Sequence, residues 1–151
     1  MEFLINLNVT SNELFRALNN TIIEDVFAFT GKKLKNEDIK KGFKYEKDVN
    51  MNKSHPKIAK VDVLEYKEGN TFTIQYSSSQ KKSIVTYKIE SESCNKVCLD
   101  YKENLFLNRK DDKGIYRFVE VPCEKVEKVP FLKKIQFHSL EKEIIKRRGE
   151  K

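Results

Sequence analysis

The stretch TGKKLKNEDIKKGFKYEK, from Thr30 to Lys47, contains seven lysines around Gly31 and Gly42 and marks a change of secondary structure. Lysines beside glycines can form a phosphate-binding loop, whose backbone amides face the anion at the N-terminus of a helix. Here Gly31 follows a helical pattern and is suited to end it, and the C-terminal end of a helix carries a partial negative charge that favours lysines. The stretch therefore indicates a solvated connection between a helix and a strand rather than an anion site.

A strand and a long amphipathic helix are predicted before this stretch. From Phe3 to Val9, every second side chain is apolar, which is the period of a strand with one wet face. Thr10 and Glu13 have the spacing of a capping box, in which two side chains satisfy free backbone amides at a helix start. We therefore expect a helix from Thr10 to Gly31, with an apolar face formed by Leu14, Phe15, Leu18, Ile22, Val26 and Phe29.

After this helix, one helical turn near Asn36 and a succession of six strands are predicted. Each strand segment alternates apolar and polar residues, and the connections are too short for helical crossovers, so antiparallel pairing is expected. One connection is the turn Glu68 to Asn70, and another is a hairpin tip from Asn108 to Gly114. The expected strand segments are GFKYEK, KIAKVDVLEY, TFTIQYSSS, KSIVTYKIES, KVCLDYKENLF and IYRFVEVP.

The pattern becomes helical again from about Val129, with Pro130 in the first turn and basic residues at the favourable C-terminal end. This terminal helix carries apolar side chains on two sides, which predicts unusually wide contact with the rest of the chain. One stripe contains Phe131, Ile135, His138 and Ile145, and the other contains Phe137, Leu140 and Ile144.

Length and composition predict one folded domain over residues 1–151. A chain of 151 residues is large enough for a hydrophobic core, and 38% hydrophobic residues lie above the range of disordered chains. The net charge of +7 permits attraction to anions, but 30 Lys and Arg are interleaved with 23 Asp and Glu along most of the chain. This interleaving disfavours specific nucleic-acid binding, which usually uses bases gathered on one face or tail.

A cytoplasmic location with free thiols is expected. The three cysteines, Cys94, Cys98 and Cys123, are odd in number, and the first residues lack the pattern of a secretory signal. No apolar segment approaches the roughly 20 residues that a membrane-spanning helix needs. The sequence is therefore expected to contain no transmembrane segment.

No catalytic constellation, metal site or cofactor site is predicted. His138 lies on an apolar helical face and could act as a base or contact a ligand, but such a residue is more often a core histidine. His55, beside Pro56, is expected in an exposed turn. Cys94 and Cys98 are separated by three residues, whereas zinc sites usually have tighter, paired spacings. Asp111 and Asp112 are expected to be solvated at the hairpin tip.

The order of elements resembles the helix-grip fold of the START-like, Bet v 1-like (SRPBCC) superfamily, in which a curved antiparallel sheet wraps around a long C-terminal helix. A narrower resemblance rests on the first strand, the helix beginning at Thr10, TGKKL at Thr30 to Leu34, and KGFKYEK at Lys41 to Lys47. These features are similar to a domain-of-unknown-function family, number 3284, of small START-like proteins from low-GC Gram-positive bacteria. The resemblance implies an α+β fold with about seven strands.

The superfamily resemblance implies a cavity between the sheet and the terminal helix, which relatives use to hold lipids, sterols, polyketides or other apolar molecules. The expected function is a non-enzymatic binding module for a small apolar ligand. The alternation of each strand supplies the candidate lining residues but leaves open which face turns inward. The candidates are Phe72, Ile74, Tyr76, Tyr87, Leu99, Tyr101, Phe118, Ile135 and His138.

Two other functions stay open at this point. The large side chains could fill the cavity, and the protein would then be an interaction or regulatory module. Its contact surface would be the sheet edge, the hairpin Asn108 to Gly114, or the basic C-terminal end KRRGEK. A hydrolase or cyclase of the helix-grip type is a weaker alternative, because no catalytic constellation supports it.

Overall fold

The computed structural model describes residues 1–48 and 57–148, which form an α+β fold with one seven-stranded sheet. His55, and Gly149 to Lys151 of the predicted basic end, lie outside the described residues. The elements in chain order are β1 (Glu2–Leu7), α1 (Ser11–Thr30), the short 3-10 helix η1 (Asn36–Asp38), β2 (Lys44–Asp48), β3 (Ile58–Lys67), β4 (Thr71–Ser77), β5 (Lys81–Ser93), β6 (Lys96–Lys110), β7 (Tyr116–Glu120) and α2 (Phe131–Arg148).

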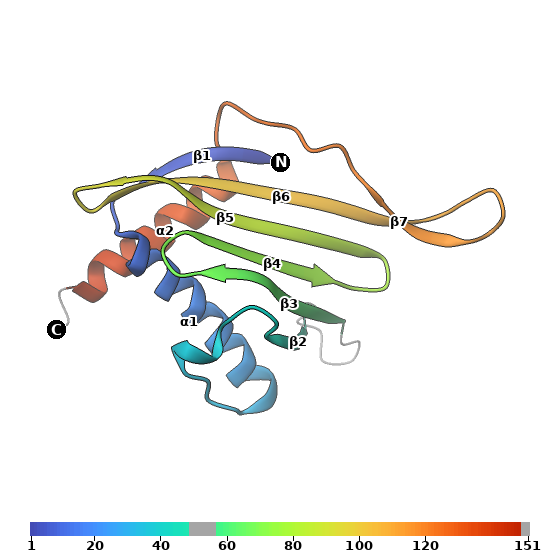
Figure 1. The fold of residues 1–151 in the computed structure, drawn as a ribbon, viewed down its shortest axis with the longest axis horizontal. Coiled ribbons are helices and arrows are strands. Elements are labelled where there is room, and N and C mark those ends of the chain that lie inside the picture. Colours follow the sequence, from blue (N-terminus) through green and yellow to red (C-terminus); the bar gives the residue numbers. More distant parts are fainter. Residues whose placement is uncertain (49–56, 149–151) are drawn as a thin grey trace.

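The sheet is curved and antiparallel, with the strand order β1-β6-β5-β4-β3-β2 (Figure 1). The long strand β6 has two partners on the same edge, because β1 pairs with residues 97–102 and β7 pairs with residues 106–110. The β6–β7 hairpin projects beyond the rest of the sheet. The sequence prediction of a curved antiparallel sheet with a C-terminal helix is confirmed. The hairpin tip is shifted, because β6 continues to Lys110 and the turn follows it.

The first helix begins and ends where the sequence predicts. Thr10 accepts a hydrogen bond from the backbone amide of Glu13, and the Glu13 carboxylate accepts one from the amide of Thr10. Gly31 adopts a left-handed conformation with φ of 76°, and its amide donates to the Phe27 carbonyl. Glycine reaches this conformation without the steric cost of a Cβ atom. Both predicted caps are confirmed.

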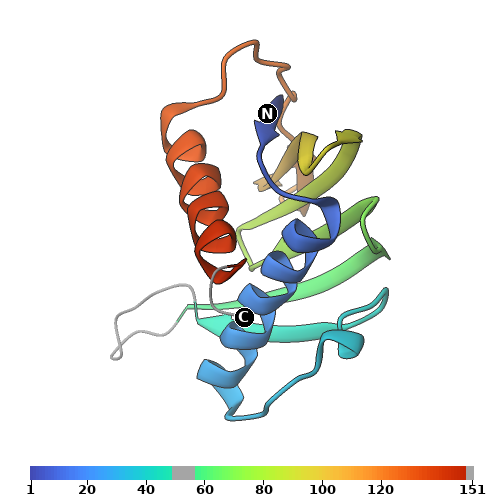
Figure 2. The same cartoon turned by 90° about the vertical axis from the view of Figure 1, so that its left-hand side faces the viewer.

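Both long helices lie on the same face of the sheet (Figure 2). α1 packs on β3 and β4 through Phe15, whose ring lies 6.1 Å from the rings of both Tyr66 and Phe72. α2 packs on β1, β5 and β6 through Phe137, whose ring contacts Phe3, Tyr87 and Tyr101. The C-terminal end of α2 meets the N-terminal end of α1, where Arg148 donates to Glu13. From this junction the two helices diverge (Figure 1).

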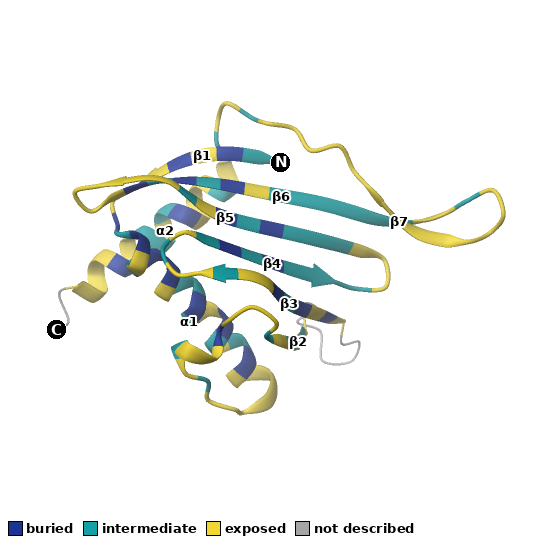
Figure 3. Ribbon diagram, viewed as in Figure 1, coloured by how far each residue is buried: buried dark blue, intermediate teal, exposed yellow. Residues whose placement is uncertain are grey.

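The prediction that α2 makes unusually wide contact with the rest of the chain is wrong. Its buried residues are Phe137 and Ile144, whereas Phe131 is 75% exposed and Ile135 is 48% exposed. The physical reason is that only one face of α2 packs on the sheet and on α1. No other described element covers the opposite face of α2. Exposed apolar side chains also occur along β7, all of whose residues are exposed (Figure 3).

Candidate functional site

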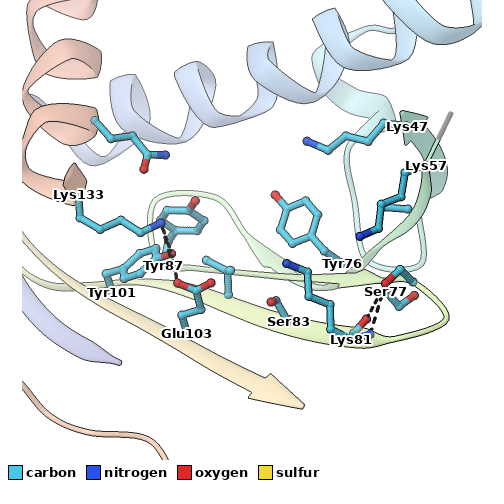
Figure 4. A pocket seen from close by; sticks show the side chains of 14 residues that line it. Lys47, Lys57, Tyr76, Ser77, Lys81, Ser83, Tyr87, Tyr101, Glu103 and Lys133 are labelled. Carbon is cyan, nitrogen blue, oxygen red and sulfur yellow. Dashed lines mark hydrogen bonds and ion pairs between the residues drawn. The ribbon is translucent and has the colours of Figure 1, made fainter. Parts of the chain in front are cut away.

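An open cleft lies on the helix-covered face of the sheet, where α1 and α2 diverge. Phe137 covers one part of this face and Phe15 covers another, so the region between the separated ends of the helices is left open. The cleft has a volume of about 670 Å³. Its lining comes from α2 and from the strands or their ends (Figure 4): Lys47, Lys57, Ala59, Tyr76, Ser77, Ser78, Lys81, Ser83, Val85, Tyr87, Tyr101, Glu103, Lys133 and Gln136.

Strand alternation and register bring these residues together. Along β5, every second residue from Lys81 to Tyr87 lines the cleft, because successive side chains of a strand point to opposite faces. Ser83 lies opposite Tyr76 of β4, and Tyr87 lies opposite Tyr101 of β6. The lining is therefore built mainly on paired strands, which hold their side chains in defined positions.

Three tyrosines form the aromatic part of the cleft. The rings of Tyr87 and Tyr101 lie 5.5 Å apart in an edge-to-face arrangement. Burial raises the pKa of Tyr76 to about 12, and burial also raises the pKa values of Tyr87 and Tyr101. Each phenol therefore stays neutral at physiological pH. Among the described residues, the hydroxyls of Tyr76 and Tyr87 have no hydrogen-bond partner, so both can bond to a bound molecule.

One end of the cleft contains a compact polar cluster of Tyr101, Glu103 and Lys133. The Lys133 ammonium donates to the Tyr101 hydroxyl at 3.1 Å and lies 3.9 Å from a Glu103 carboxylate oxygen. The Tyr101 hydroxyl in turn donates to Glu103 at 3.1 Å. This arrangement joins α2 to β6 and balances the charge of Lys133 with that of Glu103.

The other lysines extend into the cleft around Tyr76 (Figure 4). Lys47 lies 5.4 Å from the centre of the Tyr76 ring and 3.3 Å from a carboxylate oxygen of Asp25 on α1. Lys57 and Lys81 enter from the starts of β3 and β5. Four lysines and one glutamate thus line the cleft, which gives it a positive charge.

The structure brings together three of the nine predicted lining residues, namely Tyr76, Tyr87 and Tyr101. Phe72, Ile74 and Leu99 share the covered face of the sheet but are buried in the core. Phe72 lies under α1, against Phe15. Packing in the hydrophobic core thus takes up these side chains, and none of the three is among the residues that line the cleft.

The remaining three predicted residues lie outside the cleft. Phe118 is 40% exposed on β7, where the Lys82 ammonium lies 5.3 Å from its ring centre. Ile135 and His138 lie on the side of α2 that faces away from the core, and a His138 ring nitrogen is 3.4 Å from a Glu141 carboxylate oxygen. The position of Ile135 and His138 follows from the single packed face of α2, whereas Phe118 belongs to β7, all of whose residues are exposed.

The sequence reading missed the charged residues of the cleft. Alternation contains a signal for one of them, because Lys81 lies an even number of residues from Val85 and Tyr87 and so shares their face. Lys47 shares the face of Tyr45 for the same reason. The signal for Lys133 is its spacing of four residues from the buried Phe137 on α2. In the sequence these lysines are indistinguishable from ordinary solvent-exposed lysines, so none was predicted as a lining residue.

Neither a metal centre nor a membrane span emerges from the described residues. Over residues 1–48 and 57–148, no group of three or more His, Cys, Asp and Glu side chains is placed to hold a metal ion. Cys94, Cys98 and Cys123 are free thiols. The described helices are too short or too polar to cross a membrane.

Fold and site together define a class of α+β protein with a curved antiparallel sheet, a C-terminal helix and a cleft between them. Residues 1–121 match the family model described as Domain of unknown function (DUF3284), and the chain belongs to this family. The matched residues include all seven strands and end before α2.

A solved structure shows a similar fold. The crystal structure of the Mll3558 protein from Rhizobium loti superposes with a TM-score of 0.50 and 11% sequence identity, covering 96% of this chain and 92% of that chain. At this identity the likeness shows the fold alone. A comparison with curated proteins gives no match. These likenesses support no specific function.

Proposed function

We propose that the protein is a non-enzymatic binding module that holds a small molecule with an apolar body between the sheet and α2. The observation that carries the proposal is the cleft of about 670 Å³, floored by the rings of Tyr76, Tyr87 and Tyr101. Binding sites for small molecules typically have volumes of about 300–1,000 Å³ and combine apolar walls with a few polar groups. We also assign the fold to the START-like, helix-grip superfamily, whose element order it resembles.

The lining favours binding over catalysis. Glu103 is the one carboxylate among the described lining residues, and Tyr101 and Lys133 already engage it. General bases are most often histidines or carboxylates, and the described lining residues include neither a histidine nor a second carboxylate. The proposal assigns no cofactor or metal to the cleft. The three free cysteines support a cytoplasmic location, where thiols are kept reduced.

A second candidate function, an interaction module, is favoured by the β6–β7 hairpin. Ile115 is 59% exposed and Tyr116 is 64% exposed, and Phe118, Val119 and Val121 are also exposed. Adjoining exposed apolar side chains can mark a surface for a protein partner. Binding of a small molecule in the cleft distinguishes the binding module from the interaction module.

Fluorescence titration with N-phenyl-1-naphthylamine, a neutral aromatic probe, tests the cleft directly. The wild-type chain is expected to bind the probe saturably. Ser83→Trp places an indole in the cleft, so this variant is expected to lose at least about tenfold in affinity, which corresponds to about 1.4 kcal/mol. Ser83 lies on the open part of β5, where a larger side chain can extend into the cleft without entering the core.

The matched control is Thr86→Trp, which places the same side chain on the opposite face of the same strand. It is expected to bind the probe as the wild type does. Saturable binding that Ser83→Trp leaves unchanged would contradict the cleft as the site. An absence of saturable binding in all three proteins would favour the interaction module.

A further inference from the structure

The positive groups of the cleft are distributed unevenly between its two ends. At the α2 end, Lys133 is balanced by Glu103 and is held against the Tyr101 ring, with 5.0 Å between the ammonium and the ring centre. At the opposite end, Lys47, Lys57 and Lys81 line the cleft without a carboxylate among the described lining residues. The excess positive charge therefore lies at the strand-turn end, around Tyr76.

Two carboxylates approach this end from outside the lining. Asp25 pairs with Lys47 at 3.3 Å, and Asp48 accepts a hydrogen bond from the backbone amide of Lys57 at 3.0 Å. Lys81 makes no ion pair within the described part of the chain. Even with both carboxylates counted, the three lysines leave the strand-turn end with a net positive charge.

The turn between β4 and β5 fixes the position of Lys81. The Ser78 amide donates to the Lys81 carbonyl at 2.9 Å, and the Ser78 hydroxyl bonds to the amide and the carbonyl of Lys81 at 3.3 Å each. The hydroxyl of Ser77 lies on the same rim. A backbone held at both ends of the turn starts the Lys81 side chain from a defined point. The hydroxyls of Ser77 and Ser78 each donate to a backbone carbonyl, that of Lys60 and that of Lys81, so the lysine ammonium groups are the donors that this end offers to an anion.

We propose that the ligand of this cleft is an amphipathic organic anion. Its carboxylate, phosphate or sulfonate group lies at the strand-turn end with Lys57 and Lys81, and its aromatic or aliphatic body lies against Tyr76 and Tyr87. This inference rests on the proposed function and specifies the ligand class of the same site. Ammonium groups bind such anions through charge-assisted hydrogen bonds, and tyrosine rings provide the apolar contact area.

The aromatic floor distinguishes this ligand from a simple inorganic anion. A bound phosphate ion would contact the lysines alone and leave the Tyr76 and Tyr87 rings solvated. A neutral apolar molecule would contact the rings and leave the lysine charges unmatched. A molecule that carries both parts satisfies both ends of the cleft, so the two contributions to its affinity can be separated by experiment.

Two fluorescent probes with the same ring body provide this separation. 8-Anilinonaphthalene-1-sulfonate carries a sulfonate that N-phenyl-1-naphthylamine lacks. At low ionic strength, the wild-type chain is expected to bind the sulfonate probe on the order of tenfold more tightly than the neutral probe. The preference should shrink in about 0.5 M salt, because salt screens exposed charges. Inorganic phosphate at matched ionic strength is expected to leave the neutral probe bound.

Variants that remove charge test whether the lysines cause the preference for the sulfonate probe over the neutral probe. The double variant Lys57→Gln, Lys81→Gln is expected to lower the affinity for the sulfonate probe on the order of tenfold and to change the affinity for the neutral probe by less than about twofold. Lys88→Gln is the matched control, because it removes the same charge from an exposed residue on the opposite face of β5. This control should keep the wild-type preference.

The outcomes distinguish the ligand class from the proposed function. If the neutral probe binds saturably but the double variant keeps the wild-type preference, the cleft binds small molecules and the assignment of an anion is wrong. If phosphate alone displaces the sulfonate probe at equal ionic strength, the site recognises an anion without an apolar body, which also overturns the proposal. If neither probe binds saturably, the proposed function itself fails.

Discussion

Single residues of the cleft combine an apolar ring with a polar group. Tyr87 lies between Phe72, Tyr101 and Phe137, so its ring belongs to the core, while its hydroxyl reaches the cleft. The ring and the hydroxyl therefore have separate roles, in stability and in ligand contact. Removal of the whole side chain would affect both, whereas removal of the hydroxyl affects the second alone.

Tyr87→Phe is predicted to make the protein less sensitive to alkaline pH. Burial raises the pKa of Tyr87 above its usual value of 10.0, so the unfolded chain loses this proton at lower pH than the folded chain. The contribution of the neutral Tyr87 phenol to the free energy of unfolding is therefore complete below pH 10 and is lost as the pH rises above 10. The free energy of unfolding of the variant should therefore fall less steeply above pH 10, by up to about 1.4 kcal/mol per pH unit.

Urea denaturation at several pH values between about 8 and 11 measures this difference. Near pH 8 the variant should be within about 0.5 kcal/mol of the wild type, because the lost hydroxyl has no protein partner in the described structure. Tyr116→Phe controls for the loss of a hydroxyl from an exposed tyrosine. Parallel pH profiles for Tyr87→Phe and the wild type would contradict the raised pKa of Tyr87 in the folded state.

At the scale of residues, the sequence predicted the three tyrosines as lining residues but could not distinguish them from neighbouring core residues on the same face of the sheet. Phe72 and Tyr76 lie on the same face of β4, four residues apart. Phe72 contacts Phe15 of α1, whereas Tyr76 lines the cleft. The path of α1 across the sheet decides which of the two is covered, and alternation along a strand contains no information about that path.

At the scale of elements, the cleft depends on how α2 is held at its two ends. Phe137 and Lys133 hold its N-terminal half on the sheet, and Arg148 holds its C-terminal end on α1. The Glu13 carboxylate is shared between two elements, because it accepts from the Thr10 amide and from the Arg148 guanidinium. One residue thus caps α1 and anchors α2.

Glu13→Gln is predicted to lower the urea midpoint at neutral pH while leaving the cap in place, because glutamine also fits a capping box. Hydrogen bonds from Arg148 lower the pKa of Glu13 from 4.5 to about 2. This lowered pKa stabilises the folded state above pH 4.5, and the stabilisation is lost as the pH falls toward 2. The difference between variant and wild type should therefore be constant above pH 5 and vanish near pH 2.

Urea denaturation of Arg148→Gln should show the same dependence on pH, since this variant removes the other half of the pair. Arg147→Gln is the control, because Arg147 pairs with Glu143 within α2 and does not join the two helices. A constant difference from pH 7 down to pH 2 in Glu13→Gln would contradict the proposed ion pair.

The elements themselves could largely be predicted from the sequence, because their signals are local. The capping box at Thr10, the glycine at the end of α1 and the alternation of the strands each depend on a few neighbouring residues. Local signals could not show which of the two apolar sides of α2 packs against the rest of the protein. Which side packs is decided by the sheet and α1, and these contacts are distant in sequence.

At the scale of the whole molecule, one sheet face and two diverging helices produce the cleft. The helices meet at the Glu13–Arg148 junction and separate from it, so the sheet is covered near the junction and open farther away (Figure 1). The charges of the cleft come from four strands or their ends and from α2. The sequence could predict the presence of a sheet and a terminal helix, but the cleft requires their relative placement.

The most direct test of the binding function is native mass spectrometry of the full chain, purified without denaturation from the cells that naturally produce it. The account predicts a reproducible bound mass of a few hundred daltons, suited to the cleft volume, which denaturing extraction releases. Ser83→Trp should lose this mass and Thr86→Trp should keep it. A protein mass without any adduct, or an adduct that Ser83→Trp retains in full, would contradict the cleft as a ligand site.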